Sequence, residues 1–182
     1  MIRRCCLALG LCLLVACAPV VPQGRSKSGG AARWAAAVSW QAAALWASDA
    51  QICRIAGAGI GVEGWLPDAG GFWQVDYWAP SKKNVLEVTV DADGKLQTEE
   101  IKGSRVRGKT LPRDWLDSSK VWEVTRSHQR GDALNTLEAE LAVDAEPQRY
   151  PGQLVWRIRF FLDTSNYDTH VVTPLGQWLA SY

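Results

Sequence analysis

The sequence has few of the residues that most often build metal and redox sites. Its 182 residues include two histidines, His128 and His170, and five cysteines. Four of the cysteines lie within the first 17 residues, which leaves Cys53 alone in the rest of the chain. These residues do not have the spacing of metal ligands, so the sequence predicts no metal site and no cofactor. A single thiol in that part of the chain also excludes an internal disulfide there.

The sequence also has no marked excess of charge. Twenty lysines and arginines stand against 19 aspartates and glutamates, for a formal net charge of +1. Arg3 and Arg4 belong to an N-terminal segment predicted to be removed, which changes the balance to 18 against 19, or −1. A surface so balanced offers little electrostatic attraction to phosphates, and nucleic acid is not expected as a partner.

The apolar run of residues 5–16, CCLALGLCLLVA, is too short to span a membrane as a permanent helix. It follows two arginines, as the core of an export signal does. The run leads into Leu14-Val15-Ala16-Cys17, which resembles the lipobox of bacterial lipoproteins. The resemblance implies that the signal peptide, residues 1–16, is removed and that Cys17 receives a diacylglycerol and an acylated amino group. A plain secretory signal with a chance cysteine is the alternative.

Residues 17–31 are predicted to be the lipidated Cys17 and a flexible tether. The stretch 18–30, APVVPQGRSKSGG, holds two prolines, three glycines and two serines and shows no apolar periodicity. Two or three acyl chains hold a protein firmly to a bilayer, so the membrane is an expected partner through this anchor. Ala18, rather than aspartate, follows the cysteine, which by the same resemblance implies the outer membrane, on its periplasmic side, where the organism has one.

Hydrophobic periodicity predicts two helices and a series of strands in the rest of the chain. The alanine-rich segment 31–48 predicts the first helix, and Asp117 or Ser118 is expected to cap the second. Gly57–Gly71 is predicted to be a loop, with a brief strand around Ile60 as an open alternative. Strands are predicted at residues 51–56, 72–79, 85–91, 95–101, 137–143, 154–162, 169–173 and 177–180.

The order helix, strand, strand, hairpin occurs twice, which suggests an internal repeat. WQVDY at Trp73 and WRIRF at Trp156 share one pattern, and each follows an Asp-Ala pair at the same distance. The chain here resembles PepSY and PepSY-like lipoproteins, whose unit is a helix laid on an antiparallel sheet, often present twice. The resemblance implies an α+β fold of two similar units, residues 32–104 and 105–182. Each unit would be a helix packed on an antiparallel β-sheet of three to four strands, as in PepSY and cystatin-like folds, without catalytic residues.

Tryptophan is the one residue in clear excess, with ten copies. Most are expected in the core, since Trp73 and Trp156 lie on matching strand faces. Trp65, in the loop GVEGWLPDAGG, and Trp78, beside Pro80, are harder to bury. If both are exposed, they could form an aromatic patch for a glycan, a peptide or a lipid headgroup.

The polar residues give no catalytic constellation. Asp163, Asp168 and His170 suggest acid–base chemistry, but they are predicted to be exposed polar groups without a neighbouring nucleophile. The sequence therefore predicts a non-enzymatic, lipid-anchored protein of the cell envelope that binds a protein or peptide through a sheet edge or the region of Trp65 and Trp78. A carrier or sensor of a small apolar ligand, held in a groove between helix and sheet, is the alternative.

Overall fold

The computed structural model describes residues 30–68, 70–102, 109–129, 135–162 and 166–182. The signal peptide, Cys17, nearly all of the tether and Asp163 lie outside these ranges. Within them, no helix combines the length and apolarity needed to cross a membrane.

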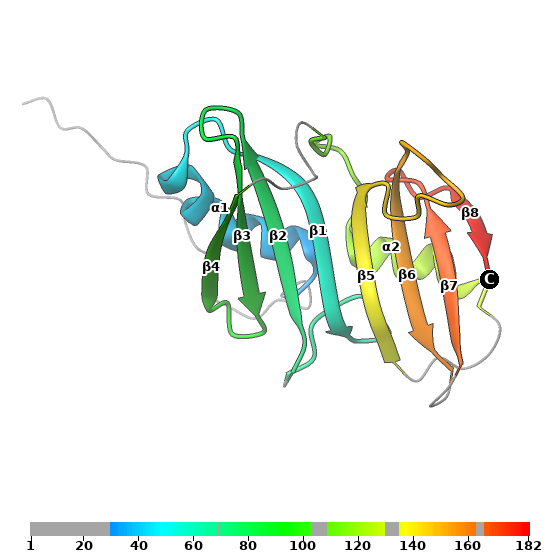
Figure 1. Cartoon of the computed structure of the whole chain (residues 1–182). Coiled ribbons are helices and arrows are strands. Elements are labelled where there is room, and N and C mark those ends of the chain that lie inside the picture. Colours follow the sequence, from blue (N-terminus) through cyan, green and yellow to red (C-terminus); the bar gives the residue numbers. More distant parts are fainter. Residues whose placement is uncertain (1–29, 69, 103–108, 130–134, 163–165) are drawn as a thin grey trace, which may run out of the picture.

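The described strands form one antiparallel sheet of eight strands in the order β4-β3-β2-β1-β5-β6-β7-β8 (Figure 1). The fold is therefore α+β, with two helices on a single sheet. The expectation of separate sheets of three to four strands is wrong, because β1 pairs with β5 from Arg54–Ala142 to Ile60–Thr136. The strands are β1 Gln51–Ile60, β2 Phe72–Ala79, β3 Asn84–Asp91, β4 Leu96–Lys102, β5 Asn135–Val143, β6 Leu154–Phe161, β7 Tyr167–Val172 and β8 Trp178–Ser181.

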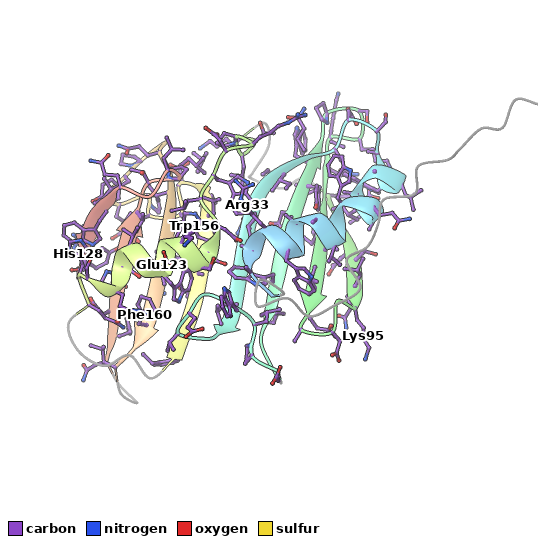
Figure 2. All side chains as sticks on the ribbon, turned by 180° about the vertical axis from the view of Figure 1, so that it is seen from behind. Arg33, Lys95, Glu123, His128, Trp156 and Phe160 are labelled. Carbon is purple, nitrogen blue, oxygen red and sulfur yellow. The ribbon has the colours of Figure 1, made fainter. Side chains whose placement is uncertain are left out.

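Both helices, α1 (Ala32–Trp46) and α2 (Ser118–Arg126), lie on the same face of the sheet (Figure 2). The buried side of α1 carries only small residues: Ala32, Ala35, Ser39 and Ala43. Small side chains let the helix lie close to the sheet, and the Ser39 hydroxyl lies 2.7 Å from the Tyr77 hydroxyl of β2. Burial raises the pKa of Tyr77 to about 12, so this hydroxyl stays neutral.

The two helices begin at the same place, and one carboxylate caps both. Asp117 is the N-cap of α2, and its Oδ1 accepts a hydrogen bond from the Ser118 backbone N–H at 2.8 Å. The same oxygen accepts from the Arg33 backbone N–H of α1 at 2.9 Å. The Ser118 hydroxyl accepts from the Ala32 N–H at 2.9 Å. Asp117 and Ser118, two consecutive residues, thus accept hydrogen bonds from backbone N–H groups at the start of both helices.

Tryptophan fills the space between the helices and the sheet. Trp73, Trp122 and Trp156 are almost completely buried. The indole N–H of Trp73 donates to the Gly30 carbonyl at 2.7 Å, and that of Trp156 donates to the Leu116 carbonyl at 3.1 Å. Each carbonyl lies two residues before the first residue of a helix. Eight of the ten indoles lie in or pack against a hydrophobic cluster, namely Trp34, Trp46, Trp73, Trp78, Trp115, Trp122, Trp156 and Trp178, as predicted for most of them.

Strand β1 runs four residues further than predicted, because its glycine is a packing residue. Gly57 lies opposite Trp73 in the sheet. A Cβ atom at Gly57 would lie 2.6 Å from Cε3 of that indole, so only glycine leaves room for the ring. The predicted loop therefore begins after Ile60, not at Gly57.

Candidate functional site

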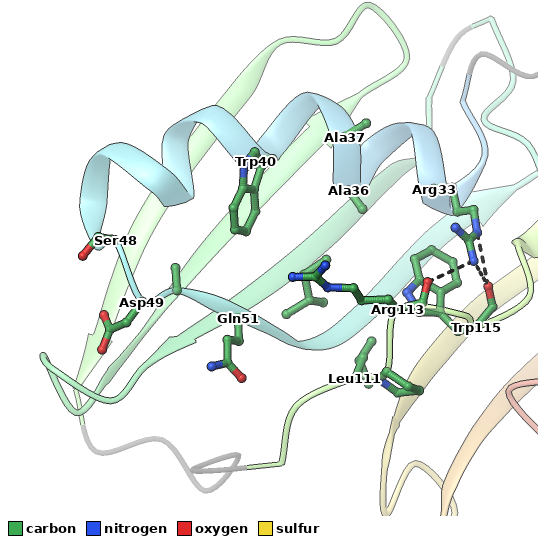
Figure 3. Close-up of a pocket in the computed structure, with 13 residues that line it drawn as sticks. Arg33, Ala36, Ala37, Trp40, Ser48, Asp49, Gln51, Leu111, Arg113 and Trp115 are labelled. Atoms are coloured by element: carbon green, nitrogen blue, oxygen red, sulfur yellow. Dashed lines mark hydrogen bonds between the residues drawn. The ribbon is translucent and has the colours of Figure 1, made fainter. Parts of the chain in front are cut away.

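The structure has a groove between α1, the start of β1 and the segment 111–115 that leads into α2 (Figure 3). Its volume is about 770 Å³. The lining residues are Arg33, Ala36, Ala37, Trp40, Ser48, Asp49, Ala50, Gln51, Ile52, Leu111, Pro112, Arg113 and Trp115. Seven of these thirteen are exposed, so the groove is open to solvent along one side.

Helix α1 supplies one wall through a single helical face. Arg33, Ala36, Ala37 and Trp40 have the spacing of residues that share one side of a helix. The two alanines leave space between the larger side chains. Trp40 is 48% exposed, and its ring lies 6.0 Å from the Tyr77 ring. The wall therefore offers a flat aromatic surface beside a shallow depression.

The opposite wall is held in place by hydrogen bonds to both neighbouring elements. The Leu111 N–H donates to the Ile52 carbonyl of β1 at 2.7 Å. The Arg33 Nε donates to the Trp115 carbonyl at 3.2 Å, and its guanidinium lies 4.7 Å from the centre of the Trp115 ring. These contacts join α1, β1 and the segment 111–115, so the groove has a defined width.

The charges in the groove are not balanced. Arg33 is bound to carbonyl oxygens, and the structure shows no ion pair to it from any described residue. The Arg113 side chain is exposed and makes no hydrogen bond or ion pair with a described residue. Asp49 is engaged by Ser81, whose hydroxyl and N–H donate to it at 2.7 and 2.8 Å and hold the pKa of the carboxyl below its ordinary value. Arg33 and Arg113 together with the ionised Asp49 leave the groove with one net positive charge, in a chain that is nearly neutral overall.

The two tryptophans that the sequence singled out do not form one patch. Trp78 is only 8% exposed and packs with Cys53 and Val85, so the expectation that it is hard to bury is wrong. It pairs with Gln51 at the start of β1, whereas Trp65 follows the end of that strand and is half-buried. A strand of ten residues separates them, a distance of about 30 Å at the usual rise of a strand.

The sequence predicted that a partner could bind at a sheet edge, and the two free edges of the described sheet are β4 and β8. Strand β4 is exposed and carries Glu99, Glu100 and Lys102. Charged residues on an edge strand discourage the addition of another strand. Strand β8 at the other edge has only four residues. The charges on β4 and the short length of β8 make the groove a better candidate for the binding site than either edge of the sheet.

Asp168 and His170 are buried, so the prediction that they are exposed polar groups is wrong. Both lie in β7, are at most 2% exposed, and are joined by a contact of 2.9 Å between His170 Nε2 and Asp168 Oδ2. The His170 ring meets Phe160 edge to face. The thiol of Cys53 is also buried, and burial raises its pKa to about 12, so it stays protonated at neutral pH. The described residues hold no group of three or more histidine, cysteine, aspartate or glutamate side chains that could bind a metal.

The face of the sheet that carries no helix has a row of ion pairs across its four central strands. Arg54 contacts Asp76 at 3.2 Å and Glu140 at 2.6 Å. Arg157 contacts Glu140 at 2.8 Å, and Arg159 contacts Glu138 at 2.6 Å. Three arginines and three carboxylates thus neutralise one another, whereas Arg33 and Arg113 of the groove form no ion pair with a described residue.

The groove residues that matter most, Trp40 and Arg113, were not predicted as site residues. Trp40 has a sequence signal, since it shares a helical face with Arg33 and two alanines. Arg113 has no such signal in the sequence, because only the fold brings residues 111–115 against β1. No family model matches the chain, and neither a curated protein nor a solved structure matches it. The proposed function therefore depends on the groove itself and on the N-terminal motif.

Proposed function

We propose that this protein is a lipid-anchored, non-enzymatic protein of the bacterial cell envelope that binds a short segment of a partner protein or peptide. The groove between α1, the start of β1 and the segment 111–115 is the binding site and the observation that carries the proposal. The lipobox-like Leu14-Val15-Ala16-Cys17 supports the anchor on Cys17. Ala18 supports the periplasmic side of the outer membrane where the organism has one.

The open side of the groove favours an extended peptide as its occupant. Pockets for small molecules cover roughly 70–90% or more of the ligand surface, which a groove open along one side does not. A peptide segment can place alternate side chains against Trp40 and the alanines and keep its other side in water. The lining mixes apolar surface with the polar groups of Gln51 and Arg113, as a peptide site requires.

A small apolar ligand is the second candidate, and the volume of the groove favours it. A value of about 770 Å³ lies within the range of roughly 300–1,000 Å³ that is common for ligand pockets. In this case the protein would be a carrier or sensor, with the ligand held between α1 and the sheet.

We further propose that the chain contains two related units, as the resemblance to PepSY-like proteins implies. Three observations support this. The order of one helix and four strands occurs twice, and the strand order of the sheet is the same read outward from β1 and from β5. Trp73 and Trp156 also bind equivalent carbonyls before the two helices.

Photo-crosslinking in intact cells tests the groove as the binding site. Benzoylphenylalanine at Ala37, inside the groove, is expected to give a crosslinked product larger than the protein. The matched control is Ala44, which is also exposed on α1 but does not line the groove. A product that retains the mass of a small molecule would favour the carrier function. Equal products from both positions, or none from Ala37, would contradict a binding groove.

A further inference from the structure

We infer that the segment bound in the groove carries a carboxylate beside an apolar side chain, and that Arg113 is the residue that receives the carboxylate. The inference deepens the proposed function and rests on it. It is drawn from the charge of the groove, from the contacts of Arg33 and Asp49, the other two charged residues that line it, and from the position of Trp40.

Arg113 is placed to bind an anion inside the groove. Its side chain extends from the segment 111–115 into the space between α1 and β1 (Figure 3). The backbone of the same residue is fixed, since its carbonyl accepts a hydrogen bond from Arg33 Nη2 at 3.4 Å. The guanidinium has no partner among the described residues. Its planar fork of donors fits a carboxylate in two parallel hydrogen bonds.

Of the two other charged groups that line the groove, Arg33 strengthens this preference, and Asp49, which carries a negative charge, is bound to Ser81. Arg33 donates to the Trp115 carbonyl and stacks on the Trp115 ring, so it adds positive potential without being free to move to a ligand. The Asp49 carboxylate already accepts two hydrogen bonds from Ser81. No carboxylate of a described residue contacts the Arg113 side chain in the groove, and an acidic ligand would supply one.

Trp40 supplies the second half of the recognition. Its indole is about half exposed and stands beside Ala36 and Ala37 on the same helical face. An apolar or aromatic side chain can lie against the ring in the space that the alanines leave. An acidic residue next to an apolar one thus matches the two features of the groove. The ion-paired face of the sheet offers no such match, since Arg54, Arg157 and Arg159 are bound to carboxylates.

The inference can be tested by selecting peptides from a random heptapeptide library displayed on phage. The purified full chain is panned as wild type, Arg113→Gln, Ala37→Trp and Arg126→Gln. Arg126 is the matched control, because it is exposed at the end of α2 and does not line the groove. Peptides selected by the wild type are expected to contain aspartate or glutamate next to an apolar residue and to lose binding to Ala37→Trp. Their Kd is expected to rise about tenfold or more in Arg113→Gln, the loss typical of a hydrogen bond to a charged group, and to stay unchanged in Arg126→Gln.

The outcomes separate the inference from the proposed function. Peptides that need an open groove but show no acidic residue, or that bind Arg113→Gln as well as wild type, would overturn the role of Arg113 and leave the peptide groove standing. If no selected peptide is sensitive to Ala37→Trp, the proposed peptide groove fails, and the inference fails with it. Arg113 is exposed, so thermal melting of Arg113→Gln is expected to match wild type and to show that any loss of binding is local.

Discussion

Asp76 is the most deeply buried carboxylate of the ion-paired face, with 3% of its surface exposed. It accepts hydrogen bonds from Gln74 Nε2 at 2.8 Å and from Arg54 Nη1 at 3.2 Å. Burial nevertheless raises the pKa of Asp76 above its ordinary value, because the loss of water outweighs the help of these two donors. The ionised form of Asp76 therefore costs stability in the folded protein, as is common for buried ion pairs.

Asp76→Asn is expected to stabilise the protein at pH 7. The folded pKa is above the unfolded one, so the contribution of Asp76 to stability is highest when the group is protonated and declines as pH rises through the two pKa values. Asparagine stays neutral at every pH and avoids that decline. In urea unfolding, the free energy of unfolding of Asp76→Asn should be higher than that of wild type at pH 7. The difference should become smaller below about pH 4. The control is Glu63→Gln, an exposed carboxylate. A mutant less stable than wild type at pH 7 would show that the ion pair with Arg54 outweighs the burial cost.

At the scale of the elements, the meeting point of the two helices fixes the wall of the groove. Asp117 and Ser118 bind the first N–H groups of α1, and Arg33 from that same turn binds the Trp115 carbonyl (Figure 2 shows Arg33 between the helices). The Ser118 hydroxyl also donates to the Gly64 carbonyl at 2.7 Å, which adds the loop after β1. Neither helix start is independent of the other.

Asp117→Ala is expected to destabilise the protein by about 2 kcal/mol, at the upper end for an N-cap, because two helices lose an acceptor together. The control Asp114→Ala removes an exposed carboxylate three residues away and should change stability by at most about 0.5 kcal/mol. Thermal or urea unfolding measures both. Hydrogen exchange adds a local readout, since the amides of Arg33 and Ser118 should both lose protection. If only the Ser118 amide lost protection from exchange, Asp117 would cap α2 alone.

The strands with strict alternation could be predicted from the sequence, and the pairing between the halves could not. The patterns at residues 72–79 and 154–162 predicted β2 and β6 almost to the residue, because alternation reflects burial on one face. Gly57 was misread, since glycine usually marks a turn and the space for Trp73 is visible only in the fold. The pairing of β1 with β5 joins distant parts of the chain and leaves no local pattern. Trp78 is buried for a similar reason, because Val85 and Ile101 come against it from β3 and β4.

At the scale of the whole molecule, the described chain starts in the middle of the structure and close to the groove. The Gly30 carbonyl accepts hydrogen bonds from the Leu66 N–H at 3.0 Å and the Trp73 indole at 2.7 Å. Arg33, three residues later, already lines the groove. The predicted tether of residues 18–30 spans at most about 40 Å when extended. A lipid on Cys17 would thus keep the groove within that distance of the membrane surface.

This arrangement gives the anchor a test that is independent of the fold. In cells fed labelled palmitate, the wild type and Cys12→Ser are expected to carry label and to sediment with membranes, because Cys12 lies within the predicted signal peptide. Cys17→Ser is expected to lose the label, since Cys17 is the predicted acyl acceptor and two or more acyl chains are what hold such a protein on a bilayer. Melting of the purified Cys17→Ser protein should match wild type, because Cys17 lies outside the helices and strands of the described residues, which begin at Ala32. If Cys17→Ser still incorporates palmitate, the acyl chain is on another residue, and the lipobox interpretation is wrong.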